Sequence, residues 1–162
     1  MHTKIEIYVH AAPDHVFRLA RDVTRWPHVL PHYRRVTVTG RRGERTVAQM
    51  VAVRAFGPLK VPVTWRAEQW PEATDADDLR LRFRHIRGVT SGMDVTWHIR
   101  PQGIGSKVTI EHEFRRRVPL LGESVLPWLV DRLFTRPIAG RTLATFKRLA
   151  EWREPGAGRQ VA

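Results

Sequence analysis

The sequence predicts an α+β fold in which a seven-stranded, curved antiparallel sheet wraps around one long C-terminal helix. Three observations support this prediction. Apolar residues recur with a period of two over residues 4–10 and 34–114, glycine-containing turns separate the later alternating runs, and the last segment carries a long apolar helical pattern. Consecutive strands joined by short turns pair antiparallel, and an apolar helix covers the open face of the sheet. We expect one domain over residues 1–154 and a disordered tail over residues 155–162.

The N-terminal part of the chain predicts one strand and two short helices. Isoleucine and valine alternate with polar residues over residues 4–10, which is typical of a strand. The first helix is expected to begin at Pro13 and Asp14, because proline and an acidic residue suit a first helical turn. The second lies over residues 26–31, where prolines limit it to one or two turns.

Six more strands are expected before the C-terminal helix. Their ranges are residues 34–41, 46–55, 61–69, 79–85, 93–100 and 108–114, with an acidic loop over residues 71–78. The fourth of these runs has the clearest alternation, because apolar side chains and His85 share one face and three arginines share the other. We therefore expect Phe83 and His85 to point into the sheet's concave side and Arg84 to point outward.

The C-terminal segment predicts the long helix. Leucine and phenylalanine recur at three- and four-residue spacing over residues 126–152, and Pro137 should kink or divide the helix. The stretch over residues 118–128 is more apolar than a surface connection needs to be. It could cover the cavity as a lid, contact a membrane or a second subunit, or simply pack under the sheet.

Composition excludes some functions and leaves others open. The absence of cysteine excludes disulfides, thiolate metal sites and a cysteine nucleophile. No secretion signal or membrane span is recognisable, so a cytoplasmic location is expected. The net charge of +12 is mostly arginine and is spread along the chain, which favours a generic basic surface over a specific nucleic-acid partner. His28 and His32 are four residues apart, but interrupting prolines disfavour a metal site, and no cofactor is expected.

Several motifs, taken in order, resemble one protein superfamily. They are Ala12-Pro13, Val16-Phe17, Asp22, Trp26-Pro27 and Tyr33 after the first strand, and later Trp65 and residues 92–97. This order is similar to that of the START-like (SRPBCC, helix-grip) superfamily, particularly the polyketide cyclase/dehydrase group that includes the tetracenomycin-type aromatase/cyclases. The resemblance covers about residues 3–153.

The resemblance implies an internal cavity for a hydrophobic, aromatic or polyketide-like molecule, in a monomer or a homodimer. In the cyclases the cavity folds a poly-β-ketone and guides its ring closure, whereas related members carry quinone or lipid unchanged. Tetracenomycin-type cyclases place a serine and an arginine two and four residues after the tryptophan that corresponds to Trp65. Here these positions are Ala67 and Gln69, so whether the protein is an enzyme or a carrier stays open. The family's other cavity arginine aligns near Arg84.

The candidate ligand-binding residues are aromatic or polar side chains on the expected inward faces. They are Trp26, Tyr33, Trp65, Gln69, Phe83, His85, Trp97 and His112. Tyr33 and His85 are the catalytic candidates, because a phenol can donate a hydrogen bond to an enolate and an imidazole can remove an α-proton near neutral pH. The alternative is ordinary core packing for the tryptophans and a hydrogen-bonded core or rim position for the histidines, and for Tyr33 a structural role is equally compatible with the sequence. The small residues Ala67 and Gly92 are expected to open a pocket of a few hundred Å³, at the low end of the ~300–1,000 Å³ typical of ligand sites.

Overall fold

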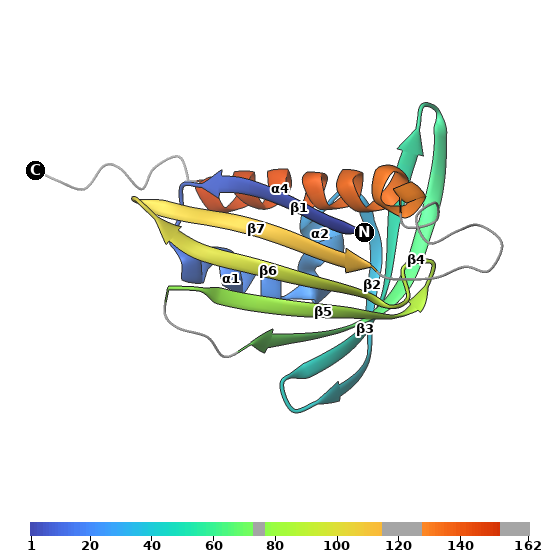
Figure 1. Cartoon of the computed structure of the whole chain (residues 1–162), viewed down its shortest axis with the longest axis horizontal. Coiled ribbons are helices and arrows are strands. Elements are labelled where there is room, and N and C mark those ends of the chain that lie inside the picture. Colours follow the sequence, from blue (N-terminus) through green and yellow to red (C-terminus); the bar gives the residue numbers. More distant parts are fainter. Residues whose placement is uncertain (73–76, 115–127, 153–162) are drawn as a thin grey trace, which may run out of the picture.

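A computed structural model describes residues 1–72, 77–114 and 128–152, and it confirms the predicted α+β architecture (Figure 1). The N-terminal elements are β1 (His2–Val9), α1 (Pro13–Arg21), the 3₁₀ turn η1 (Val23–Arg25) and α2 (Trp26–Val29). The next strands are β2 (Tyr33–Arg42), β3 (Arg45–Phe56), β4 (Leu59–Glu72), β5 (Leu79–Gly88), β6 (Met93–Gln102) and β7 (Gly105–Phe114). The C-terminal elements are the π-helical turn η2 (Asp131–Thr135) and α4 (Arg136–Glu151).

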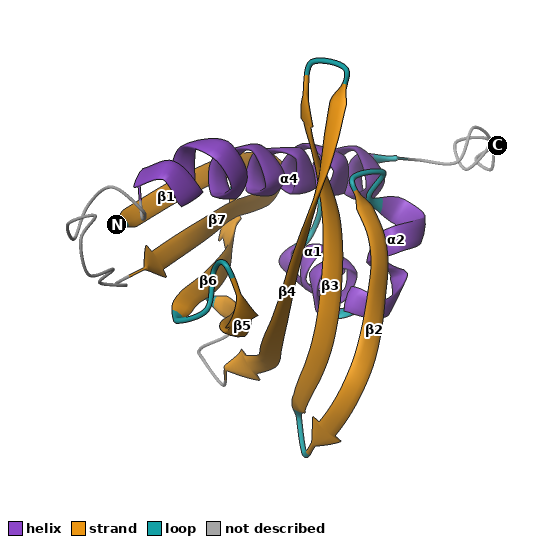
Figure 2. Cartoon of the chain, turned by 90° about the vertical axis from the view of Figure 1, so that its right-hand side faces the viewer, coloured by secondary structure: helices purple, strands orange, loops and turns teal. Residues whose placement is uncertain are grey.

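All seven strands form one antiparallel sheet in the order β1-β7-β6-β5-β4-β3-β2. Each of the strands β2 to β6 pairs with the next strand in the sequence. Strand β1 pairs with β7, at the edge of the sheet opposite β2, with Ile5 opposite Ile110. The sheet curves strongly, and α4 runs across its concave side (Figure 2). The short helices α1 and α2 close the same side of the sheet beside α4.

The core lies between the concave sheet face and the helices. On β6 the apolar residues Met93, Val95, Trp97 and Ile99 are all buried, as their alternation predicts. From the helix side, Phe146 of α4 is completely buried against them. The inward-facing apolar side chains of the strands therefore pack against the apolar face of α4, and this burial is the main source of stability.

The predicted orientation of β5 is confirmed. Leu81 and Phe83 are buried on the concave side, while Arg80 and Arg82 lie on the outer face and form ion pairs with Glu72 at distances of 3.5 and 4.0 Å. A shift of one residue would have placed the arginines in the core, because successive side chains of a strand point to opposite faces.

Strand β4 is longer than the sequence indicates, since it continues through Pro71 to Glu72 instead of ending before the acidic loop. Proline cannot donate a ladder hydrogen bond, so it is tolerated only where a strand has a free edge. Pro62 pairs with β3 alone and Pro71 pairs with β5 alone. Both prolines thus lie where β4 has one neighbouring strand, which is why neither of them ends it.

The C-terminal helix is not divided at Pro137; it continues from a π-helical turn into α4. Pro137 lies in the first turn of α4, where the missing N–H is tolerated, and the π-helical turn η2 precedes it. Residues 118–127 of the apolar stretch and the expected tail over residues 155–162 lie outside the described residues. Within residues 1–72, 77–114 and 128–152, no helix is both long and apolar enough to cross a membrane.

Candidate functional site: an aromatic cavity beside the C-terminal helix

A cavity of about 80 Å³ lies between the concave face of the sheet and the C-terminal helices. Residues from α2, from strands β2 to β7 and from η2 and α4 line it. The volume is smaller than the few hundred Å³ expected, because large side chains fill the space. Ala67 and Gly92, which were expected to open it, are not among its lining residues. Ala67 is completely buried elsewhere in the core, and Gly92 lies in the β5–β6 turn with a φ of 90°.

Trp26 is the centre of the aromatic wall. It lies at the start of the short helix α2, and its ring packs at 5.1 Å from Tyr33 and 5.8 Å from Phe83, measured between ring centroids. Trp97 and Phe146 lie 6.1 and 5.9 Å from the same ring. These tilted and edge-on arrangements are favourable for aromatic pairs. They hold α2 against the sheet and α4, and four of the five rings, those of Trp26, Tyr33, Phe83 and Trp97, belong to residues that line the cavity.

Two nitrogen atoms of residues that line the cavity are buried with no hydrogen-bond partner among the described residues. They are Nε1 of Trp26 and Nδ1 of His112. Both residues are more than nine-tenths buried. An unpartnered buried polar group costs about 1–3 kcal/mol, so a water molecule or a ligand oxygen that reaches either nitrogen would be stabilising. A molecule that brings an oxygen atom to each of them would remove that cost.

His85 lies at the opposite end of β5 from the acidic loop, and its neighbours fix its ring. The imidazole stacks on Trp65, and Nδ1 lies 2.7 Å from the hydroxyl oxygen of Thr90 in the following turn. Burial, aided by the nearby His112, lowers the pKa of His85 to about 3. Burial also lowers the pKa of His112 to about 4, against the attraction of Asp131. Both imidazoles are therefore neutral at physiological pH.

Tyr33 connects the cavity to the helix side. It is buried on β2, and burial raises the pKa of its phenol above the ordinary value, while the adjacent Thr142 hydroxyl opposes the shift. The Thr142 hydroxyl donates to the carbonyl oxygen of Ile138 at 2.9 Å, so its oxygen is free to accept a hydrogen bond from Nε2 of His32 at 2.9 Å. Tyr33 thus keeps its proton and remains a hydrogen-bond donor.

Seven of the eight candidate residues line the cavity together. They are Trp26, Tyr33, Trp65, Phe83, His85, Trp97 and His112. Gln69 is placed elsewhere. Its side chain faces inward as expected, but it lies outside the cavity lining and its Nε2 donates to the carbonyl oxygen of Arg21 at 2.8 Å. Arg84 is also outside, with its Nε 3.9 Å from the Asp94 carboxylate, which agrees with the strand alternation and not with the family's alignment.

The helix side of the cavity was not identified from the sequence. Thr135, Ile138, Ala139 and Thr142 line it. Their spacing of three, one and three residues follows one face of a helix and could have indicated them. Pro137 does not interrupt this face, because the helical path continues through η2 into α4.

The described residues do not assemble a metal site. No group of three or more histidine or carboxylate side chains among them could hold a metal ion. The residues that line the cavity are aromatic rings, three threonines and one tyrosine with hydroxyl groups, and two neutral histidines. Such groups bind an uncharged molecule that contains a few oxygen atoms.

Residues 2–155 match the family described as polyketide cyclase/dehydrase and lipid transport. A relative with 30% identity is the bifunctional cyclase/dehydratase of the actinorhodin polyketide synthase of Streptomyces coelicolor. The similar region comprises 142 residues, which is 86% of this chain and 41% of the relative. The chain therefore spans less than half the length of that protein.

Solved structures of the same fold include proteins of both kinds named in that family description. An aromatase/cyclase from Streptomyces sp. R1128 aligns with a TM-score of 0.74 at 16% identity, over 98% of each chain. A STAR-related lipid transfer protein from Xanthomonas axonopodis aligns with a TM-score of 0.63 at 15% identity, over 91% of this chain and 85% of the other. At these identities the likeness is one of fold.

Proposed function

Because the chain belongs to the polyketide cyclase/dehydrase and lipid transport family, we propose that it binds a small, mainly apolar molecule in the cavity beside α4 and guides its cyclisation or dehydration. The expected molecule is aromatic or polyketide-like. The observation that carries this proposal is the pairing of an aromatic wall with two unpartnered nitrogens, on Trp26 and His112. Flat faces suit a ring, and the nitrogens suit its oxygen substituents.

The site is better suited to directing ring closure through the shape of its walls than to removing protons with a strong base. With pKa values of about 3 and 4, the imidazoles of His85 and His112 accept protons less readily than an ordinary histidine, by about 3–5 kcal/mol. Tyr33, by contrast, stays protonated and can donate a hydrogen bond to an oxygen that gains negative charge during ring closure. We therefore assign the walls to folding the ligand, Tyr33 to stabilising developing charge, and the histidines to hydrogen bonding.

A second candidate function is a carrier that holds a lipid or quinone without altering it. It is favoured by the residues that this chain has where tetracenomycin-type cyclases have a serine and an arginine, namely Ala67 and Gln69. Ala67 has no proton to give or take, and Gln69 is occupied by the Arg21 carbonyl. Neither residue lines the cavity. An enzyme would have to work without these two groups, whereas a carrier has no need of them.

Native mass spectrometry of the purified protein, followed by extraction and identification of the bound molecule, distinguishes these functions. An aromatic or polyketide-like molecule supports the first, and a quinone or lipid supports the second. Offering a linear β-polyketone and following ring-closed products then tests for chemistry. If a bound molecule remains after the cavity has been filled by mutation, the ligand binds elsewhere and both proposals are wrong.

A further inference from the structure

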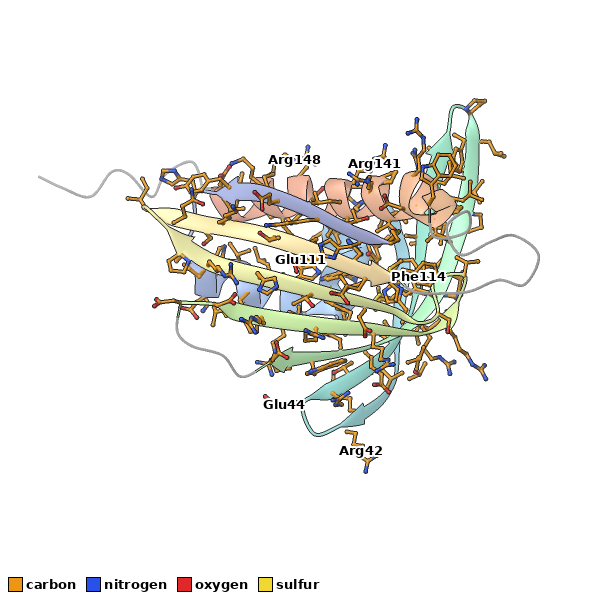
Figure 3. All side chains as sticks on the ribbon, in the orientation of Figure 1. Arg42, Glu44, Glu111, Phe114, Arg141 and Arg148 are labelled. Carbon is orange, nitrogen blue, oxygen red and sulfur yellow. The ribbon has the colours of Figure 1, made fainter. Side chains whose placement is uncertain are left out.

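A second concavity, distinct from the aromatic cavity, lies where the starts of β2 and β4 meet the outer side of α4. It is an open groove of about 370 Å³, and four cationic side chains line it: Arg34, Lys60, Arg141 and Arg148. Arg141 and Arg148 are seven residues apart on α4 and lie along the same side of the helix (Figure 3). No carboxylate belongs to the groove lining in the part of the chain that the structure describes.

The four groove cations lack carboxylate partners in the described part of the chain, unlike several other arginines of the protein. Arg80 pairs with Asp78 at 2.7 Å, Arg136 with Asp131 at 2.8 Å, and Arg45 with Glu68 at 3.4 Å. None of the four groove cations forms an ion pair with any described residue. Four like charges around one concavity repel each other, so the groove is a region of strong positive potential.

Two of the residues that line the groove are buried and polar, Thr145 and His32. The hydroxyl of Thr145 accepts a hydrogen bond from Nη2 of Arg148 at 3.3 Å. His32 is held by Thr142 at 2.9 Å. Burial and the charge of Arg141 together lower the pKa of His32 to about 4, so the imidazole is neutral. The positive potential therefore comes from the four cations, and the two buried residues add hydrogen-bonding groups. Proline, valine and alanine side chains form the remaining walls.

We infer that this groove binds the phosphate group of a small anionic molecule, at a site separate from the aromatic cavity. A phosphate group carries up to two charges and several acceptor oxygens, so it can accept hydrogen bonds from more of these cations than a single carboxylate can. The apolar walls offer a place for the part of the molecule next to the phosphate. The phosphate could be that of a soluble ester or of a lipid headgroup.

Calorimetric titration with sodium pyrophosphate, at low salt and at about 150 mM salt, tests this inference. The groove variant is Arg141→Gln/Arg148→Gln. The matched control is Arg41→Gln/Arg42→Gln, which removes the same charge from the exposed end of β2, in a hairpin that is not part of the groove. We expect saturable binding to the parent, affinity at least about 10-fold lower in the groove variant, and less than about 2-fold lower in the control. Lys60→Gln, on a different element, serves as a second groove variant if the helix double variant does not fold.

Vesicles of phosphatidylglycerol and phosphatidylcholine, compared with phosphatidylcholine alone, identify the source of the phosphate. Binding that needs phosphatidylglycerol and is lost in the groove variant assigns it to a lipid headgroup. Pyrophosphate binding without that vesicle effect assigns it to a soluble ester. Equal weakening in the groove and control variants would reduce the effect to net charge and overturn the inference, as would the absence of saturable pyrophosphate binding to the parent.

Discussion

The imidazole of His85 stacks on the indole of Trp65 inside the cavity, with 5.8 Å between the ring centroids and 23° between the ring planes. The contact with Thr90 at 2.7 Å fixes the remaining rotation of the ring. Burial of this half-buried ring lowers its pKa to about 3, so it stays neutral in the folded protein at physiological pH. We expect the consequence to appear in the pH dependence of folding.

We expect the free energy of unfolding of His85→Phe to fall less than that of the parent as the pH is lowered. The unfolded chain binds a proton at this histidine below about pH 6.5, whereas the folded chain binds it only near pH 3. The stabilising contribution is thus complete above pH 6.5 and is lost as the pH falls toward 3. Between pH 7 and pH 5 the parent should lose about 2 kcal/mol more stability than the variant, as measured by urea unfolding. Phenylalanine keeps the ring against Trp65.

Thr90→Val is the control for that experiment, because it removes the hydrogen bond to His85 but keeps the titrating group. It should retain the pH dependence of the parent while losing some stability at every pH. If the parent and His85→Phe lose the same stability between pH 7 and pH 5, His85 gains its proton in the folded protein as readily as in the unfolded chain. That result would contradict the effect of burial on its pKa.

The sequence predicted the side-chain directions that follow from alternation along a strand. It did not predict the features that depend on packing between elements distant in the sequence. The side of β5 on which Phe83 and Arg84 lie follows from a period of two, and the structure and the family match confirm that orientation and the START-like resemblance. The inward direction of Gln69 was also correct. What lies against an inward face depends on elements distant in the sequence, and in this case the end of α1 covers Gln69. The cavity volume depends on the same packing and was therefore overestimated.

Asp78 should be the most important carboxylate on the outer face. It lies 2.7 Å from Nε of Arg80 and 2.9 Å from Nη2 of Arg100. Although partial burial opposes it, hydrogen bonds from Arg100 and Arg80 lower the pKa of Asp78 to about 2. Asp78→Asn should cost about 1–2 kcal/mol at neutral pH, after allowance for the exposure of Arg100. Thermal unfolding measures this change.

The control for Asp78 is Asp94→Asn, which removes one longer and more exposed ion pair, that with Arg84 at 3.9 Å. Such pairs contribute little, so its effect should stay within about 0.5 kcal/mol. The difference between the two variants should shrink as the pH falls from about 4 to 2, because the folded-state carboxyl of Asp78 is half protonated in the parent at about pH 2. A difference that keeps its full neutral-pH size at pH 2 would exclude ionisation of Asp78 as its cause.

The unpartnered nitrogen of Trp26 predicts a preference among ligands of equal size. Phenol and toluene each have one ring and one substituent, but only phenol brings an oxygen that can accept a hydrogen bond from Nε1. We expect the parent to bind phenol more tightly than toluene by about 10-fold, and Trp26→Phe to bind both equally. Changes in NMR chemical shifts give the affinities. Trp152→Phe, at an exposed tryptophan, should keep the preference of the parent. A phenol preference that survives in Trp26→Phe would assign it to another donor.

Filling the cavity from the helix side gives the most direct test of the site. Ala139 lines the cavity on α4 and is more than nine-tenths buried, whereas Ala144 is exposed on the same helix. Both can be changed to leucine, which forms helices well, so Ala139→Leu and Ala144→Leu differ mainly in where the added atoms lie. The added methyl groups at position 139 should occupy much of the 80 Å³ space.

Ala139→Leu should reduce phenol binding by at least about 10-fold, and Ala144→Leu should leave it within about 2-fold of the parent. Any strain at position 139 should cost no more than about 1–3 kcal/mol, and circular dichroism and thermal unfolding would measure it separately from binding. The same pair of variants applies to a molecule that co-purifies with the protein, which should be absent from Ala139→Leu and present in Ala144→Leu. A folded Ala139→Leu that binds phenol as tightly as the parent would place the binding site outside the aromatic cavity, and the aromatic wall around Trp26 would then be a packed core.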